Sequence, residues 1–535
     1  MGRRRALTVA IGPAGASGAC ALLIAQLAWA QSAGHPGGTP PAVLAVPAVP
    51  AVPAVPAVLA VPAGQPAPAV VADLRAAIDS MVNGRDFANA HWGVLIVDPV
   101  RGDTLYSRNA GKLFMPASNQ KLLTGAVAVA RLGATYRWRT VLATRGTVRR
   151  GVLRGDLRVI GTGDPTVSDA MRGDVLTALG ALADSLKARG IRRIAGRIVQ
   201  AGDAFPGDGY GFGWAYDDFD EPYSAPVDEL FINDGMARLQ FTGGRRAGSP
   251  TTVRMRPAPG AVPLTSRVRT VAHPSRADAL AARWTGDRYE VSGAVGPRDS
   301  SALDLAIRAP GHAWLATFAA ALRAHGVRVD GAIAVDTGTS RGALDTLVRW
   351  DSPPLSDVLP HFEKASQNQL GEVLFRTLGR VADSAGTPEA GRRVVLAQLA
   401  AWGIDSTMVA VRDGSGLSRH DYVSPNAIVR VLDAMRITGD SVLFREALPV
   451  AGVDGTLARR MRGTAAQGNV RAKTGFVDKA RSLSGYVTTA DGHMLLFSLL
   501  CNNWTTPVAA VERVQDAIAV RLASLSLPAP DAQRP

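Results

Sequence analysis

Cysteine is nearly absent from this chain of 535 residues. Cys20 and Cys501 are the only two, and Cys20 lies in a predicted leader, so the mature chain keeps one thiol and a disulfide framework is excluded. Histidine pairs at the spacing of metal ligands are also missing, and the sequence predicts neither a metal nor another cofactor. The eight histidines are His35, His91, His273, His312, His325, His361, His420 and His493.

Lysine is scarce, with six residues against 53 arginines. Arginine cannot lose its proton inside a protein, so a cationic side chain that must act as a general base has to be lysine. A chain so biased towards arginine keeps lysine mainly where arginine would fail. The six positions are Lys112, Lys121, Lys187, Lys364, Lys473 and Lys479.

The formal net charge is +14. No run of lysine and arginine with interleaved aromatic residues is present, so we expect no nucleic-acid partner. The basic balance suits an anionic cell-wall polymer or an acidic membrane surface, and peripheral association with either is one interpretation. A scattered basic surface without a partner is the other.

The first thirty residues have the pattern of a signal peptide. Arg3 to Arg5 supply the positive segment, Cys20 to Leu27 the apolar segment, and Ala28-Trp29-Ala30 a small-residue cleavage site. A lipoprotein signal at Cys20 is disfavoured, because the apolar run follows the cysteine. We therefore expect export to the periplasm or another extracytoplasmic cell-wall space, by either the general or the twin-arginine route.

Residues 31–70 are predicted to be a linker rich in alanine, valine and proline. Pro47, Pro50, Pro53 and Pro56 recur at every third position, and each proline removes a helical hydrogen-bond donor. The segment therefore cannot be a membrane helix although it is apolar. It is either an extended polyproline II spacer or a disordered tail.

The rest of the chain predicts an α/β (α+β) fold interrupted by an insertion. Short strands between glycine, proline and aspartate turns predict one or two smaller β-rich domains over residues 134–302. The catalytic domain is expected to comprise residues 71–133 and 303–526. Its predicted helices are 72–83, 119–132, 312–325, 355–383, 388–402, 425–437 and 508–525, and its predicted strands are 92–98, 104–108, 468–476, 481–489 and 493–502.

Ser118 and Lys121 open a strongly apolar predicted helix that follows Pro116 and ends at Gly133. Residues three apart share a helix face, so the Lys121 amine can lie beside the Ser118 hydroxyl. Unpaired N–H groups at the start of a helix favour negative charge developing there. The pair predicts a serine nucleophile with a lysine base, provided that burial lowers the lysine pKa.

Two later motifs complete a pattern. Ser366-Gln367-Asn368 is common in any protein and is by itself more often a cap or a turn. Lys473-Thr474-Gly475 lies on a predicted strand, where Lys473 supplies positive charge to a cleft and Gly475 allows close approach of the backbone. In this order the three motifs form the signature of penicillin-recognising serine enzymes.

From about residue 72 to 525 the chain resembles the class C low-molecular-mass penicillin-binding proteins, the D-alanyl-D-alanine carboxypeptidase/endopeptidases. The gap of 248 residues between Ser118 and Ser366 is similar to the corresponding gap in this family, whose extra domains are inserted there. It is far longer than the gap in β-lactamases. Further matching motifs are Gly163-Asp164-Pro165-Thr166, Ser224-Ala225-Pro226, Asp413-Gly414-Ser415-Gly416-Leu417-Ser418-Arg419, Leu448-Pro449-Val450-Ala451-Gly452 and Arg460-Met461-Arg462-Gly463-Thr464-Ala465-Ala466.

The resemblance implies a transpeptidase-like (serine β-lactamase-like) domain, an antiparallel sheet flanked by helices. It implies that Ser118 attacks the penultimate D-alanyl carbonyl of peptidoglycan peptides while Lys121 takes its proton. Ser366 and Asn368 relay protons to the leaving group and bind the peptide backbone. An acyl-enzyme is then hydrolysed by water, and β-lactam antibiotics inhibit by stalling at that stage.

The resemblance also assigns the substrate-binding groups. Lys473 and Thr474, on the strand with Gly475, hold the terminal carboxylate, and the backbone N–H groups of Ser118 and Phe476 form an oxyanion hole. The family has Ser or Thr where Phe476 stands, so the balance between carboxypeptidase and endopeptidase action is left open. Two further expectations each have a surface or turn role as the alternative: Arg419 contacts the carboxylate of the peptide side chain, and Asp203 binds the amino group of diaminopimelate.

Two other functions are alternatives to this one. A β-lactamase or esterase on the same scaffold is disfavoured by the long insertion. A catalytically inactive wall-binding homologue is disfavoured by the intact Ser118, Lys121, Ser366, Asn368 and Lys473.

Overall fold

A computed structural model describes residues 69–335 and 343–527 of the chain. The predicted signal peptide lies outside the described residues, and so does the predicted linker except its end. Helix α1 (Ala69–Val82) begins three residues before the expected start and includes the last two residues assigned to the linker. Within the described ranges, no helix has the length and apolar character needed to cross a membrane.

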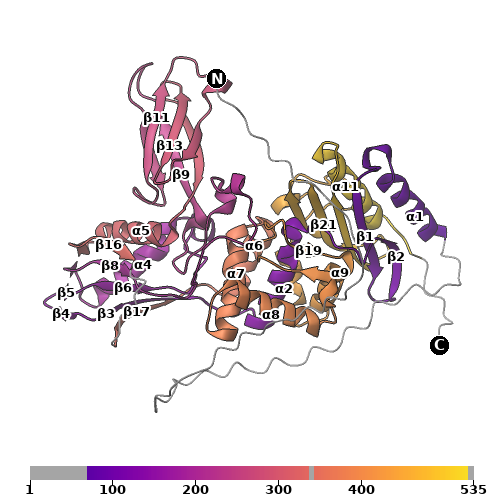
Figure 1. Cartoon of the computed structure of the whole chain (residues 1–535), viewed down its shortest axis with the longest axis horizontal. Coiled ribbons are helices and arrows are strands. Elements are labelled where there is room, and N and C mark those ends of the chain that lie inside the picture. The colour runs from indigo at the N-terminus through magenta and orange to yellow at the C-terminus, as the bar shows by residue number, and fades with distance from the viewer. Residues whose placement is uncertain (1–68, 336–342, 528–535) are drawn as a thin grey trace, which may run out of the picture. The chain divides into compact units, whose positions relative to one another are not determined.

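The predicted antiparallel sheet is present and has five strands in the order β2-β1-β22-β21-β20 (Figure 1). Both faces are covered, because alternate residues of β1 belong to different hydrophobic clusters: Trp92 and Val94 to one, Leu95 and Val97 to the other. The strands are β1 (His91–Asp98), β2 (Asp103–Arg108), β20 (Arg471–Val477), β21 (Ala480–Thr488) and β22 (Met494–Asn502).

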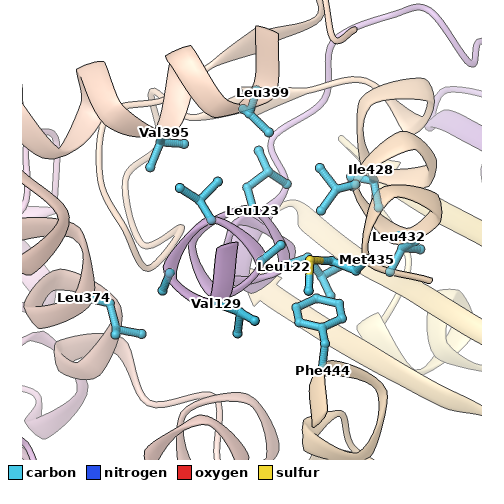
Figure 2. Packing of buried hydrophobic residues seen from close by; sticks show 14 of the residues in the cluster. Leu122, Leu123, Val129, Leu374, Val395, Leu399, Ile428, Leu432, Met435 and Phe444 are labelled. Atoms are coloured by element: carbon cyan, nitrogen blue, oxygen red, sulfur yellow. The ribbon is translucent and has the colours of Figure 1, made fainter. Parts of the chain in front are cut away.

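Helices α1 and α11 (Val508–Ala523) cover one face of this sheet, and α2 (Gln120–Leu132) and α9 (Pro425–Arg436) lie against the other. Figure 2 shows how completely α2 is enclosed, with side chains of four helices converging on Leu122, Leu123 and Val129. The converging side chains are Leu374 from α7 (Asn368–Asp383), Val395 and Leu399 from α8 (Pro388–Ala401), Ile428, Leu432 and Met435 from α9, and Phe444 from α10 (Ser441–Ala447).

The helix predicted over 355–383 is wrong in one respect, because it is two helices. α6 (Leu355–Lys364) ends before Ser366, and α7 begins at Asn368. Ser366 has a left-handed φ of 58°, which interrupts the helical path, and the Gln367 side chain caps α7 by accepting from the Leu370 N–H. The break presents the Ser366 motif as a sharp turn.

In its described residues, the inserted region contains four small sheets and two long helices, α4 (Val175–Ala188) and α5 (Pro310–Ala324). A five-stranded sheet joins β16 (Ile333–Val335), β8 (Ile198–Gln200), β6 (Leu157–Ile160), β3 (Arg139–Thr144) and β17 (Asp345–Asp351). A four-stranded sheet joins β15 (Arg328–Val329), β7 (Arg193–Ile194), β5 (Val152–Arg154) and β4 (Thr147–Arg149). One three-stranded sheet joins β10 (Thr252–Arg256), β9 (Met236–Thr242) and β14 (Ser300–Ala306). Another joins β11 (Leu264–Thr270), β13 (Tyr289–Val295) and β12 (Ala281–Trp284).

The expected end of the insertion at residue 302 is too early. Strand β17 pairs with β3, and Trp314 and Phe318 of α5 share a hydrophobic cluster with the β-strands of the insertion. Residues up to 351 therefore belong with the inserted core. Sequence periodicity shows that α5 is apolar but not which core it joins.

The two ends of the insertion are hydrogen-bonded to each other. The Leu355 N–H donates to the Tyr136 carbonyl at 2.8 Å, and the Ser356 N–H donates to the Ala134 carbonyl at 3.0 Å. The chain therefore leaves the part that contains the β2-β1-β22-β21-β20 sheet after α2 and returns to it at α6 through neighbouring segments.

Candidate active site

Ser118 lies in a single 3-10 turn, Ala117–Asn119, that leads into α2. Ala117 has a left-handed φ of 47°, so the serine follows a backbone conformation that is unusual for a residue with a side chain. Buried Asn119 fixes the turn to strand β20 by donating from Nδ2 to the Lys473 carbonyl at 2.8 Å. The Ser118 hydroxyl is thereby placed between a helix start and a strand.

The Lys121 amine has three hydrogen-bond partners. Nζ lies 3.0 Å from Ser118 Oγ, 2.6 Å from Asn368 Oδ1 and 2.7 Å from the Ser415 carbonyl oxygen. The last two can only accept, whereas a hydroxyl can also donate. A neutral amine has two protons for the two acceptors, and its lone pair then faces the Ser118 hydroxyl. The geometry suits a base.

Burial also favours the neutral amine. Lys121 is fully buried, and this burial, together with the positive charge of Lys473, lowers its pKa to about 7. Negative charge from Asp413, Glu363 and Glu372 opposes the shift. Near neutral pH, a substantial fraction of the amine is therefore able to accept a proton.

The structure brings the second and third motifs together. Lys473 Nζ donates to Ser366 Oγ at 2.8 Å, so Ser366 stands beside a second buried amine. Asn368 is held between two elements, because Oδ1 accepts from Lys121 and Nδ2 donates to the Tyr223 carbonyl at 2.9 Å. Tyr223 belongs to the inserted region, which thus supports the Ser366 motif directly.

Strand β20 passes unusually close to Ser118 at Gly475. A Cβ atom there would lie 2.9 Å from the Ser118 nitrogen and 2.7 Å from the Pro116 carbonyl oxygen, so only glycine permits this approach. Next to it, Thr474 Oγ1 donates to Thr456 Oγ1 at 2.7 Å. Phe476 points away from the core: its side chain is 53% exposed, and the Arg481 guanidinium lies 5.3 Å from its ring centre.

The sequence did not predict three buried groups around the lysines: the carboxylates of Glu363 and Glu372 and the backbone carbonyl of Ser415. Both carboxylate oxygens of Glu363 are buried without a hydrogen-bond partner in the described part of the chain. Burial raises the Glu363 pKa and lowers the Lys473 pKa, while the attraction between the two groups opposes both shifts. Glu372 accepts from the Ser415 N–H at 3.0 Å and so positions the carbonyl that binds Lys121. Nothing in the sequence distinguishes these glutamates from exposed helical ones.

The two expectations beyond the three motifs are not part of this network. Arg419 donates to the Asp478 carbonyl at 3.2 Å, which joins the loop after Asp413 to the end of β20. Asp203 is exposed after β8, and over the described residues it makes no hydrogen bond to Ser118 or Lys121. The described residues, 69–335 and 343–527, contain no group of three or more His, Cys, Asp or Glu side chains placed to hold a metal ion.

Comparisons with known proteins find relatives over most of the chain. The chain is 34% identical over 472 residues to the D-alanyl-D-alanine carboxypeptidase of Actinomadura sp. (strain R39), covering 85% of each protein. It is 27% identical over 410 residues to the D-alanyl-D-alanine carboxypeptidase DacB of Haemophilus influenzae, covering 74% of this chain and 82% of the relative. The crystal structure of penicillin binding protein 4 from Haemophilus influenzae matches with a TM-score of 0.71 at 25% identity, over 85% of this chain and 99% of that one.

The predicted fold class and family resemblance are therefore confirmed. The family model described as D-Ala-D-Ala carboxypeptidase 3 (S13) matches residues 74–525, which include all three motifs. The chain belongs to the D-Ala-D-Ala carboxypeptidase 3 (S13) family.

Proposed function

We propose that this chain is a serine-type D-Ala-D-Ala carboxypeptidase and/or D,D-endopeptidase that acts on peptidoglycan stem peptides through an acyl-enzyme on Ser118. The observation that carries the proposal is the buried Lys121 amine, which has two carbonyl acceptors and a third neighbour, Ser118 Oγ, at 3.0 Å. Family membership and the named activities of its relatives support the substrate class.

In the first step Lys121 takes the Ser118 proton, and Oγ attacks the carbonyl carbon of the penultimate D-alanine. The backbone N–H groups of Ser118 and Phe476 stabilise the oxyanion, whatever side chain stands at position 476. Lys473 and Thr474 hold the substrate carboxylate beside them. Ser366, which accepts from Lys473, passes its proton to the leaving nitrogen as the carbon–nitrogen bond breaks, and it takes in return the proton that Lys121 acquired from Ser118, so that Lys121 is neutral again.

In the second step water hydrolyses the Ser118 ester, with Lys121 again as the base. A β-lactam enters the same first step, but its leaving group stays attached to the acyl part and the ester persists. Such acylation by β-lactams makes them the expected inhibitors.

We further propose that the catalytic part is formed by residues 69–133 and 352–527.

Location outside the cytoplasm is part of the proposal. It is supported by the signal-peptide pattern of residues 1–30 and by a substrate that lies in the cell wall. Peripheral contact with the wall or membrane follows from the basic charge alone and is the weaker part of this proposal.

Labelled penicillin tests the function. The purified protein is incubated with the drug beside Ser118→Ala, and we expect durable labelling that the variant lacks. Rapid turnover of the drug would instead identify a β-lactamase, and absence of labelling in the unaltered protein would indicate an inactive homologue. Release of D-alanine from a pentapeptide ending in D-alanyl-D-alanine then confirms the peptidase.

The pH dependence of acylation follows from Lys121. The neutral amine is the active form, so the rate should be at its plateau above the pKa of about 7 and should fall about tenfold per pH unit well below it. The measurement is the second-order rate of penicillin acylation between pH 5 and 9. A rate that stays constant from pH 5 to 8 would contradict the assignment of Lys121 as the base.

A further inference from the structure

Glu363 is a buried carboxylate that the reaction described above does not use. It lies near the end of α6, on the face that packs against α2 and that is otherwise apolar. Neither of its carboxylate oxygens accepts a hydrogen bond from a residue that the structure describes. A carboxylate buried in such surroundings destabilises the fold unless a cation compensates for the loss of water. Its presence therefore points to a cation close by.

Two contacts place Glu363 beside the candidate active site. A Cβ atom at Gly125, one helical turn after Lys121 on α2, would lie 2.6 Å from Glu363 Oε1, so a glycine there leaves room for the carboxylate. The Ser366 N–H donates to the Glu363 backbone carbonyl at 3.3 Å. Glu363 is thus held between the helix that carries Lys121 and the turn that carries Ser366.

The cations that act on Glu363 are two amines, Lys473 on β20 and Lys121 on α2, and both side chains are fully buried. Burial lowers the pKa of both amines, and at Lys473 the charge that opposes this shift is that of Glu363. At Lys121 the opposing charge of Asp413 has a larger effect than that of Glu363. The carboxylate therefore stabilises positive charge on Lys473 more than on Lys121.

The proposed reaction needs the two amines in opposite states. Lys121 must be neutral to take a proton, whereas Lys473 must be charged to hold the substrate carboxylate. The hydrogen bonds of Lys473 suit the charged form, because two of its protons go to Ser366 Oγ at 2.8 Å and the Thr474 carbonyl at 3.1 Å, and the third is left for the substrate. With Glu363 ionised and Lys121 neutral, these three buried groups together carry no net charge.

We infer that Glu363 is a positioning residue that assigns the positive charge of this centre to Lys473 and thereby keeps Lys121 neutral. The inference rests on the proposed function and names the group that sets the protonation state of its two lysines. Glu363 acts through Lys473, whose charge in turn disfavours a proton on Lys121. Without the carboxylate, Lys473 would be a buried cation that gives up its proton at a lower pH.

Other charged groups near this centre do not replace Glu363. Arg481 on β21 disfavours positive charge on Lys473, and Glu372 of α7 favours it on Lys121. Further ionisable groups on the elements around α6 are paired with one another: Lys364 with Asp454, His361 with Asp234, and Glu446 of α10 with Arg471. Among the described residues, Glu363 is therefore the anion with the largest effect on Lys473.

Glu363→Gln tests the inference through the pH profile of penicillin acylation, measured from pH 5 to 10. The acid limb belongs to Lys121, and loss of the Lys473 proton bounds the plateau on its alkaline side, since the drug also carries a carboxylate. Glutamine has a similar shape without the charge, so we expect the alkaline limb to move lower by at least about one pH unit. The acid limb should move less, because Glu363 acts on Lys121 more weakly.

Two variants serve as controls. Glu363→Asp keeps the charge and should bring the alkaline limb most of the way back to its position in the unaltered protein. Glu389→Gln is the same change at an exposed glutamate of α8 and should leave both limbs unaltered. If Glu363→Gln does not fold, Glu363→Met takes its place, because methionine leaves no unpaired polar group among apolar side chains.

The outcomes distinguish this inference from the proposed function. A labelled, unaltered protein whose alkaline limb stays in place in Glu363→Gln would overturn the inference alone. Equal shifts in Glu363→Gln and Glu363→Asp would also overturn it, because they would show a role in packing and not in charge. Absence of labelling in the unaltered protein would overturn the proposed function and this inference with it.

Discussion

Lys121→Met should lower the rate of penicillin acylation by about 10³-fold, which corresponds to about 4 kcal/mol of transition-state stabilisation. Methionine has a similar length and is readily buried, but it has no lone pair that can accept the Ser118 proton. The measurement is the second-order acylation rate with labelled penicillin, followed long enough to detect slow labelling. Because Lys121 is enclosed by α2 and its neighbours, the melting temperature is measured in parallel.

Methionine leaves the Asn368 amide oxygen and the Ser415 carbonyl without their donor, yet it also removes a buried cation. These effects on the free energy of unfolding oppose each other, so we expect a folded protein. Lys112→Met is the matched control and should acylate normally. Retention of more than a tenth of the rate by Lys121→Met would assign the base elsewhere, and Ser366 with Lys473 would be the next candidate.

Gly475→Ala is expected to lower acylation by at least 10²-fold. The added Cβ would lie 2.1 Å from Ser482 Oγ, 2.7 Å from the Pro116 carbonyl oxygen and 2.9 Å from the Ser118 nitrogen, all too close. Two of these atoms are backbone, so β20 must move away from the turn that carries the nucleophile. Such a displacement separates the two N–H groups of the proposed oxyanion hole, and an error of about 1 Å in position can cost about 10²-fold in rate.

A second variant separates the loss of catalysis from simple destabilisation. Adding Ser482→Ala to Gly475→Ala removes the closest contact, so the melting temperature should partly recover while the acylation rate stays low. Gly439→Ala is the matched control, because a Cβ there has open space. Normal acylation by Gly475→Ala would show that β20 need not approach Ser118 so closely.

The proximity of two residues of the candidate site could be predicted because they are close in sequence. Ser118 and Lys121 are one helical turn apart, and the helix fixes their relation whatever surrounds it. The scarcity of lysine pointed to Lys121 and Lys473 before any fold was known. The antiparallel sheet was also readable, since three apolar segments near the C-terminus are separated by short turns.

The missed features depend on long-range contacts. Ser366 interrupts a sequence that is helical by periodicity, and only its packing between Lys473 and the inserted region explains the turn. Glu363 looks like a surface residue until α6 is placed against α2, where a Cβ on Gly125 would lie 2.6 Å from its carboxylate. The predicted end of the insertion at residue 302 also missed a long-range contact, because the pairing between β3 and β17 joins strands about two hundred residues apart in sequence.

The hydrogen bonds between the ends of the insertion bear on how such a protein can be assembled in evolution. A segment whose ends are neighbours can be gained or lost in a single genetic event without moving the helices that it connects. Here the insertion also supports the candidate site, because the Tyr223 and Asp234 carbonyls within the insertion accept from Asn368 and Gln367. An ancestor or a shortened design without the insertion would keep its sheet, but it would need another support for the loop that carries Ser366.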